Sequence, residues 1–150
     1  GWAVAESGIL ERLSLLKLAA DTQSSTLNMA ATSAYLARFD LDIHIARSVP
    51  VYRHKRDLML HTMVETFPDG VSWSEPDGGL FTWLTFPQGF DAAAFMAEQL
   101  LPKAKVAFVP GATFFPVQQQ PQHARVSFSG VPDDRLVRGV TAIGTLLRQL

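Results

Sequence analysis

The clearest candidate for anion chemistry in this sequence is Arg125, within the run HARVSFSG over residues 123–130. Alternation along a strand places Arg125, Ser127 and Ser129 on one face and the apolar residues of the run on the other. A guanidinium in an apolar strand needs an anion, and its planar fork matches a carboxylate or a phosphate. The residues leave two interpretations open: Arg125 binds a ligand, or it pairs with an acidic side chain of this chain.

Other residue types used in catalysis lack the neighbours that they would need. Ser127 and Ser129 are not in the GxSxG turn of a hydrolase nucleophile. His54 and His61 share one predicted helix face without a third ligand, so we predict no metal site. The basic run YRHKRD, residues 52–57, is typical of the solvated face of a helix rather than of a phosphate site.

The lysines also lack the surroundings of a catalytic amine. None of them lies in a glycine- or serine-rich turn that would hold a buried amine with a lowered pKa. We expect all of them to be solvated and protonated at neutral pH. They are Lys17, Lys55, Lys103 and Lys105.

Composition sets broad limits on the class of protein. With 150 residues, 47% of them hydrophobic and no cysteine, the chain is expected to form a globular core without disulfides or thiolate metal sites. The net charge of −1 and the lack of a long apolar run predict no nucleic-acid partner for this part, no membrane and a cytoplasmic location. The opening GWAVA is typical of a buried strand of a larger sheet. We therefore expect a piece of a longer protein; the alternative is a short added sequence ahead of a native start.

Hydrophobic spacing predicts the elements that must position Arg125. Helices are expected over ESGILERLSLLKLAAD, over MAATSAYLARF, and over a longest segment that Asp42 would cap and Pro50 would kink or split. The polar run at residues 22–28 is a predicted loop. VSWSEP and LFTWLTF form a predicted hairpin, followed by a helix capped by Asp91, strands at VAFVPG and ARVSFSG, and a closing helix. This order predicts an α+β fold: a small, mostly antiparallel sheet of about four strands packed by helices.

In this order and spacing, the segments resemble the carboxyl-terminal part of class I/II aminotransferases, the fold-type-I enzymes that use pyridoxal phosphate (PLP). The resemblance is greatest to 2-aminoadipate and kynurenine aminotransferases and to the aminotransferase-like half of MocR-type regulators. It covers nearly the whole chain. The stretches that carry it are GWAVA, LKLAADTQSS, VYRHKRDLM, EPDGGLFTWLTFP, VAFVPGATFF and ARVSFSG.

The resemblance implies a ligand for Arg125, because an arginine at this position of the family binds the α-carboxylate of the substrate. It also implies pyridoxal 5'-phosphate as the cofactor of the full-length parent. The family's Schiff-base lysine and a phosphate-binding arginine lie just before the strand that GWAVA matches, and so outside this sequence. We therefore expect the chain as given to hold no catalytic residue, to bind no cofactor and to be inactive on its own.

The resemblance also divides the chain. Residues 1–44 are expected to be a remnant of the large PLP-binding domain, made of a strand, a helix, a loop and a short helix. Residues 45–150 are expected to be the small domain of the fold, including its long inter-domain helix. The family is homodimeric, and one loop is the candidate for reaching the neighbouring subunit's active site. Its residues are Gln23, Ser24, Ser25 and Thr26.

The sequence thus predicts a fragment of an aminotransferase that transfers an amino group between an amino acid and a 2-oxo acid, with Arg125 as its substrate-binding residue. An alternative is the effector half of a MocR/GntR-type transcription regulator, with a DNA-binding domain upstream. A third interpretation is a binding module without catalysis.

Overall fold

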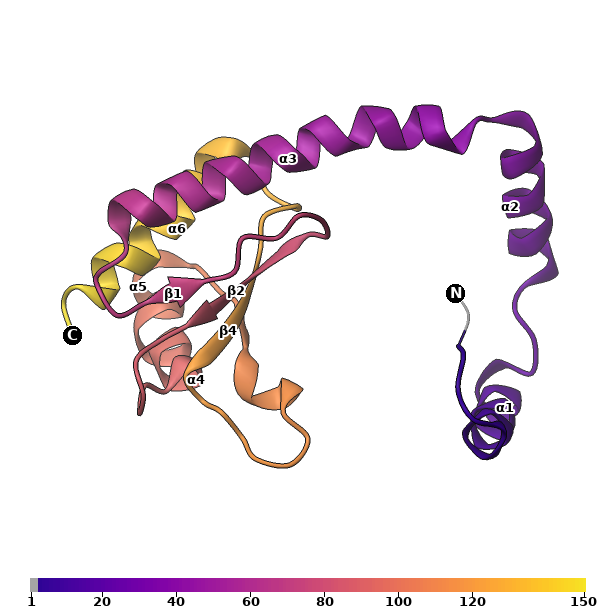
Figure 1. The fold of residues 1–150 in the computed structure, drawn as a ribbon, viewed down its shortest axis with the longest axis horizontal. Helices are drawn as coiled ribbons and strands as arrows, with labels where there is room; N and C mark the ends of the chain where they lie inside the picture. The colour runs from indigo at the N-terminus through magenta and orange to yellow at the C-terminus, as the bar shows by residue number, and fades with distance from the viewer. Residues whose placement is uncertain (1–2) are drawn as a thin grey trace. The chain divides into compact units, whose positions relative to one another are not determined.

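The computed structural model describes residues 3–150, which divide into two compact units that meet after Ile45. In the first unit, residues 3–6 have no regular structure, so the strand expected at GWAVA is not formed there. Its first two residues lie outside the described chain. Helix α1 spans Ser7–Asp21 and helix α2 spans Thr26–Arg38 (Figure 1).

Two polar side chains determine where helices begin in this part of the chain. The Ser25 hydroxyl accepts a hydrogen bond from the Asn28 N–H at 3.4 Å and caps α2. The loop predicted over residues 22–28 is therefore shorter than expected, because α2 begins at Thr26. Asp40, not Asp42, caps the next helix, since its Oδ1 accepts the N–H groups of Asp42 at 2.9 Å and Ile43 at 3.3 Å.

Helix α3 spans Leu41–Thr66 and continues through Pro50, so the expected split does not occur (Figure 1). A proline inside a helix removes one N–H and leaves the carbonyl four residues earlier without its partner. That residue is Ala46, which is exposed, so water can satisfy its carbonyl. The apolar residues of this segment are buried only toward its end, at Met59, Met63 and Phe67.

The second unit contains a four-stranded sheet in the order β1-β2-β4-β3, with every pair antiparallel. The predicted α+β fold with a small antiparallel sheet is confirmed, as is the hairpin of β1 with β2. The strands are short, and the two edge strands have only two residues each. Their bounds are β1 Ser72–Trp73, β2 Phe81–Thr85, β3 Val109–Pro110 and β4 His123–Ser127.

The segment predicted as one helix after Asp91 consists of α4 (Ala92–Phe95), a π-helical turn (Met96–Leu100) and α5 (Leu101–Ala104). The Asp91 cap is confirmed, because its Oδ1 accepts the N–H groups of the second and third helical residues at 3.0 and 2.9 Å. The closing helix α6 spans Asp133–Leu147.

The core lies between the helices and one face of the sheet. Leu84, Ala124 and Val126 supply the sheet side of this core, and the buried faces of α3, α4 and α6 supply the rest. Helices α3 and α6 approach closely, since a Cβ placed on Gly144 would lie 2.4 Å from the Thr66 carbonyl oxygen. Within residues 3–150, no helix has the length and apolar character of a membrane span.

Candidate functional site

Arg125 lies on the sheet face that points away from this core. On β4 its neighbours across the sheet are Trp83 of β2 and Val109 of β3. The predicted alternation is confirmed: Ala124 and Val126 are buried in the core, whereas Arg125 is half-buried on the other face.

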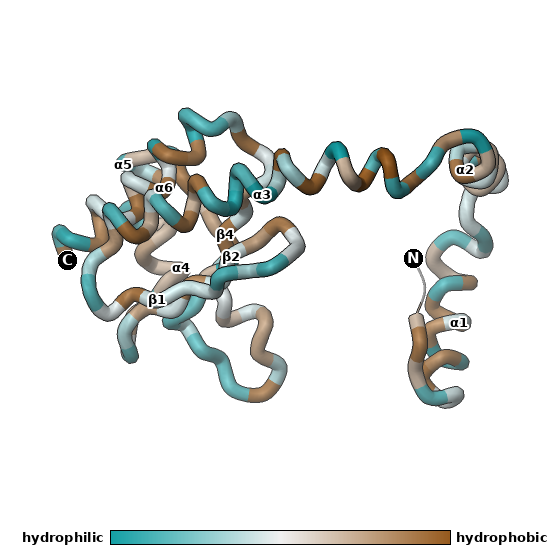
Figure 2. Tube along the Cα trace, turned by 45° about the horizontal axis from the view of Figure 1, so that its top comes forward, coloured by the Kyte–Doolittle hydropathy of each residue, from teal (hydrophilic) through white to brown (hydrophobic). Residues whose placement is uncertain are grey.

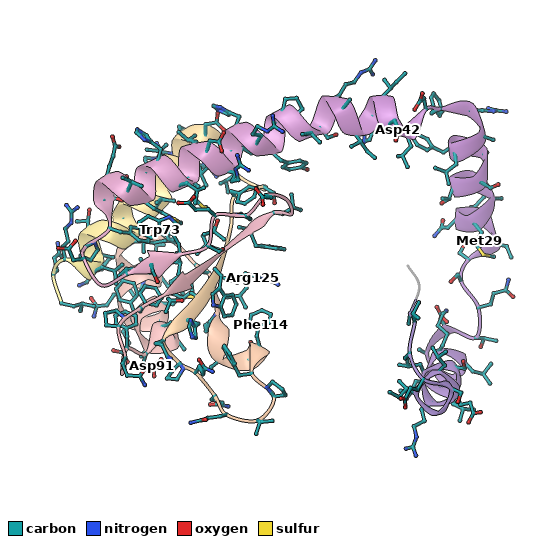
Figure 3. All side chains as sticks on the ribbon, in the orientation of Figure 1. Met29, Asp42, Trp73, Asp91, Phe114 and Arg125 are labelled. Atoms are coloured by element: carbon teal, nitrogen blue, oxygen red, sulfur yellow. The ribbon has the colours of Figure 1, made fainter. Side chains whose placement is uncertain are left out.

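Two phenyl rings contact the Arg125 guanidinium. Its central carbon lies 4.2 Å from the ring centroid of Phe81 and 5.1 Å from that of Phe114, both within cation–π range. Arg125 and Phe114 are labelled in Figure 3. Among residues 3–150 no carboxylate forms an ion pair with Arg125, and its buried Nε has no hydrogen-bond partner. The interpretation of Arg125 as half of an intrachain ion pair is therefore excluded for the described residues. Its role as a carboxylate clamp stays a prediction.

An aromatic stack supports this face of the sheet beside Arg125. The Trp83 ring meets Phe114 edge-on at 5.5 Å and stacks on His123 at 5.6 Å, and Phe115 stacks on the same imidazole at 5.4 Å. Phe114 therefore contacts both the Trp83 ring and the Arg125 guanidinium.

His123 is held at both ring nitrogens. Its Nδ1 lies 3.1 Å from the Thr85 hydroxyl, and its Nε2 lies 3.1 Å from Oε1 of Gln120. An amide oxygen only accepts, so Nε2 donates to Gln120, and a neutral ring then accepts the Thr85 hydroxyl proton at Nδ1. Both ring nitrogens of His123 therefore already have partners, whereas Nε of the neighbouring Arg125 has none.

Gly111 makes this packing possible. It begins a 3₁₀ turn, Gly111–Phe114, which approaches β4 so closely that a Cβ on Gly111 would lie 2.4 Å from the His123 Cβ. Any larger residue would push the turn outward and move Phe114 away from Arg125. Sequence patterns missed Phe81 and Phe114 as neighbours of Arg125, because only strand register and this close approach bring them together.

The two serines predicted beside Arg125 take part in the turn at the end of β4. The Ser127 hydroxyl lies 3.1 Å from that of Ser129 and donates to the Leu80 carbonyl at 3.3 Å. These contacts join the end of β4 to the residue before β2. The hydroxyls are thus engaged with each other and with backbone rather than with the guanidinium.

The predicted inter-subunit loop lies in the first unit, where all four of its residues are exposed. Ser25 caps α2 and Thr26 is its first residue, while Gln23 and Ser24 lie in the short connection before it. Their predicted role at a neighbouring subunit stays a prediction.

The basic run over residues 52–57 is not simply a solvated helix face, contrary to the prediction. His54 Nε2 lies 2.8 Å from one Asp133 carboxylate oxygen, and Lys55 Nζ lies 3.2 Å from the other. Arg56 donates to the Pro76 carbonyl at 3.1 Å. Hydrogen bonds from His54 and Lys55 lower the pKa of Asp133 below its ordinary value. The run therefore ties α3 to the start of α6 and to the β1–β2 connection.

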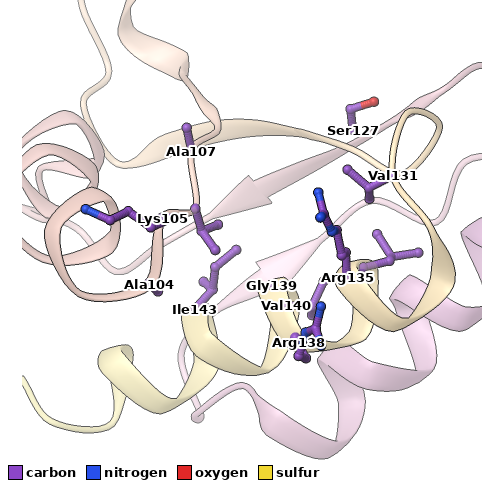
Figure 4. A pocket seen from close by; sticks show the side chains of 12 residues that line it. Ala104, Lys105, Ala107, Ser127, Val131, Arg135, Arg138, Gly139, Val140 and Ile143 are labelled. Carbon is purple, nitrogen blue, oxygen red and sulfur yellow. The ribbon is translucent and has the colours of Figure 1, made fainter.

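A cavity of about 520 Å³ lies between the segment that follows α5 and helix α6 (Figure 4). Its wall mixes apolar residues such as Val106 and Ile143 with the basic side chains of Lys105, Arg135 and Arg138. Arg138 at this cavity is paired with Asp134 at 3.0 Å, so its charge is already balanced. In residues 3–150 no group of three metal-binding side chains is suited to a metal ion.

Comparison with known proteins shows what this chain is similar to. The aromatic-amino-acid aminotransferase 1 of Thermococcus litoralis is 32% identical over 149 residues, which cover 99% of this chain and 35% of that protein. The crystal structure of LysN, the alpha-aminoadipate aminotransferase of Thermus thermophilus, matches with a TM-score of 0.83 and 29% identity over 97% of this chain and 37% of that one. The chain is related to the PLP-dependent aminotransferases.

This relationship confirms the predicted resemblance, including its aminoadipate branch. The predicted resemblance to transcription regulators also has a match. The HTH-type transcriptional regulator NorG of Staphylococcus aureus is 28% identical over all 150 residues, which are 33% of its length. The chain spans about a third of the length of the curated relatives that it matches. No protein-family model matches the chain.

The described residues of this aminotransferase-related chain do not fit PLP by themselves. The cofactor needs an accessible amine of lowered pKa and a cradle for its phosphate. Lys17 is paired with Asp21, Lys103 is paired with the Gln99 amide, and Lys105 is exposed at the end of α5. The Lys55 side chain is only 15% exposed and pairs with Asp133, so the expectation that all lysines are solvated is wrong for it.

Proposed function

We propose that this chain is part of a PLP-dependent aminotransferase, in which Arg125 binds the α-carboxylate of an amino acid or a 2-oxo acid. The amino group would move between those two substrates. The Schiff-base lysine and the phosphate-binding groups would belong to a part of the protein outside this chain. This chain on its own would transfer no amino group. Under the same proposal, residues 1–44 belong to the large domain and residues 45–150 form the small domain.

One observation carries the proposal: a half-buried guanidinium without an anion. Arg125 contacts two phenyl rings and no carboxylate of residues 3–150, although a buried charge normally has a partner. A substrate carboxylate would supply the missing charge through two parallel hydrogen bonds. Held by that planar fork, the substrate keeps its α-amine free and in a set direction, which is the positioning that amino transfer needs.

Other parts of the proposal depend on the resemblance. They are a homodimer, a contact of residues 23–26 with the neighbouring active site, and a cytoplasmic location. The second candidate function, the effector half of a transcription regulator, is favoured by the match to NorG over the whole chain. In that case Arg125 would bind the carboxylate of an effector, and the full-length protein would bind DNA without turning over substrate.

The test uses the full-length protein that carries this chain. Arg125→Gln should raise KM for amino-acid substrates about 10- to 100-fold, because a charge-assisted bidentate contact is lost. Arg125→Lys should recover only part of this loss, since an ammonium lacks the fork. Amine substrates without an α-carboxylate should be unaffected by either substitution. An unchanged KM for amino acids in Arg125→Gln would refute the proposed role.

A further inference from the structure

We propose that Phe114 and Phe81 are positioning residues, which hold the Arg125 guanidinium in its binding orientation before a carboxylate arrives. This inference rests on the proposed function of Arg125 and adds to it the means by which the arginine is kept ready. It concerns residues that do not themselves touch the carboxylate.

The contacts of Arg125 differ from those of an ordinary surface arginine. Its central carbon lies over the Phe81 ring at 4.2 Å and within 5.1 Å of the Phe114 ring centroid. Arginine loses considerable rotamer freedom when a ligand fixes it, and this loss weakens binding. Rings that already fix the side chain reduce that loss without competing for its hydrogen bonds.

The hydrogen-bonding state of Arg125 shows which atoms are left for the ligand. Nε is buried and has no partner, and none of the ion pairs of residues 3–150 involves the two terminal nitrogens. The ring contacts therefore leave the terminal end of the fork for a planar carboxylate.

Phe114 is itself held in place, which a positioning residue requires. Its ring meets Trp83 edge-on at 5.5 Å, and Gly111 allows its turn to approach β4. Trp83 is the direct cross-strand neighbour of Arg125. The next residue, Phe115, contacts Trp83 and His123 instead, so the same turn supplies a matched control.

The kinetic test compares Phe114→Leu with Phe115→Leu in the full-length protein. Phe114→Leu should raise KM for α-carboxylate substrates about threefold to tenfold with kcat nearly unchanged, and Phe115→Leu should not. The rise in KM should be the same for alanine and for phenylalanine as substrates. In the double variant Arg125→Gln/Phe114→Leu, KM should be no higher than in Arg125→Gln alone, because both substitutions act through one guanidinium.

A second measurement needs no activity and uses the 150-residue chain itself. The Arg125 Nε–H signal in a ¹⁵N spectrum, assigned by its disappearance in Arg125→Lys, should carry a ring-current shift. Phe114→Leu and Phe81→Leu should each move this signal toward the value of a free arginine, and Phe115→Leu should leave it in place. Phe114 and Phe81 are 45% and 43% exposed, so these variants should fold.

The outcomes separate this inference from the proposed function. If Arg125→Gln weakens substrate binding but Phe114→Leu changes neither KM nor the Nε–H signal, the positioning role is wrong and the carboxylate role stands. If Arg125→Gln itself has no effect, the proposed function fails first. A Phe114→Leu loss that grows with the size of the substrate side chain would mean direct contact with substrate and would also overturn the positioning role.

Discussion

The two units differ in what their apolar residues contact. Every described residue up to Ile45 is exposed, including Leu16 at 66% and Leu18 at 57% on α1, and hydrophobic positions recur along α1 and α2 (Figure 2). On α6 of the second unit, Leu136 and Ile143 are 3% and 1% exposed. Both helices have apolar residues at helical spacing. Spacing therefore predicts a helix and the need for a partner, and it does not indicate where that partner is.

The second unit therefore has a hydrophobic core of its own, and the described residues of the first unit do not. Helix α1 contributes no buried residue, whereas α3, α4 and α6 all contribute to the single core cluster. Most helical stability in proteins comes from packing of an apolar face rather than from propensity. Large apolar surfaces of this kind usually mark a contact with another protein segment. The comparison can be tested by matched substitutions in the two units.

The largest difference is expected for apolar truncations. Met63→Ala removes a fully buried side chain and should lower the free energy of unfolding by about 2–5 kcal/mol. Leu16→Ala, at an exposed position of α1, should change it by less than about 0.5 kcal/mol. Denaturant unfolding of the 150-residue chain, followed by tryptophan fluorescence, measures both. Equal losses would show that the first unit unfolds cooperatively with the core.

A smaller difference is expected for the helix caps. Asp91→Ala should cost about 1 kcal/mol of global stability, because Asp91 caps a helix that is part of the core. Ser25→Ala removes the cap of α2, which buries nothing, so it should speed hydrogen exchange at the start of α2 without moving the global unfolding midpoint. A shift of that midpoint by Ser25→Ala would contradict the division into units.

The smallest effect is expected at Asp133, which joins α3 to α6 within the second unit. Hydrogen bonds lower its pKa in the folded chain, so its contribution to stability is complete well above the ordinary value of 3.8 and is lost as pH falls through the lowered folded value. Asp133→Asn should therefore destabilise slightly at pH 7 and progressively less in acid. Asp134→Asn, which leaves the contacts of Asp133 with His54 and Lys55 intact, is the control. Unfolding midpoints of both variants between pH 3 and 7 provide the measurement, and a constant Asp133→Asn effect would contradict the assignment.

Several features of the fold follow from the sequence because they depend on near neighbours. Alternation predicted which face of β4 carries Arg125, and the register of β4 against β2 agrees. Asp91 was predicted as a cap from its place before a helical run, and it caps α4. The element order and the antiparallel hairpin were predicted for the same reason: residues within a few positions of each other determine helix periods, caps and turns.

Local sequence pattern did not predict which aspartate caps α3 or what Pro50 does to that helix. Asp40 and Asp42 both precede an apolar helical run, and only the backbone geometry selected Asp40 as the cap. Pro50 was expected to kink or split α3, and the helix continues through it; whether a proline breaks a helix depends on whether the freed carbonyl can reach water, which is a matter of exposure. In each case the sequence supplied the correct kind of residue and the tertiary structure chose the outcome.

The sequence by itself determined an α+β chain related to aminotransferases, with one arginine on the outer face of a strand. Only the tertiary structure decided what surrounds that arginine: Phe81 reaches it through strand pairing, and Phe114 through a turn that Gly111 lets close onto β4. It also decided that the Lys55 side chain is mostly buried and paired with Asp133 rather than solvated. The physical reason is the same throughout. Side-chain periodicity is a property of adjacent residues, whereas the environment of a charge is set by segments that meet only when the chain folds.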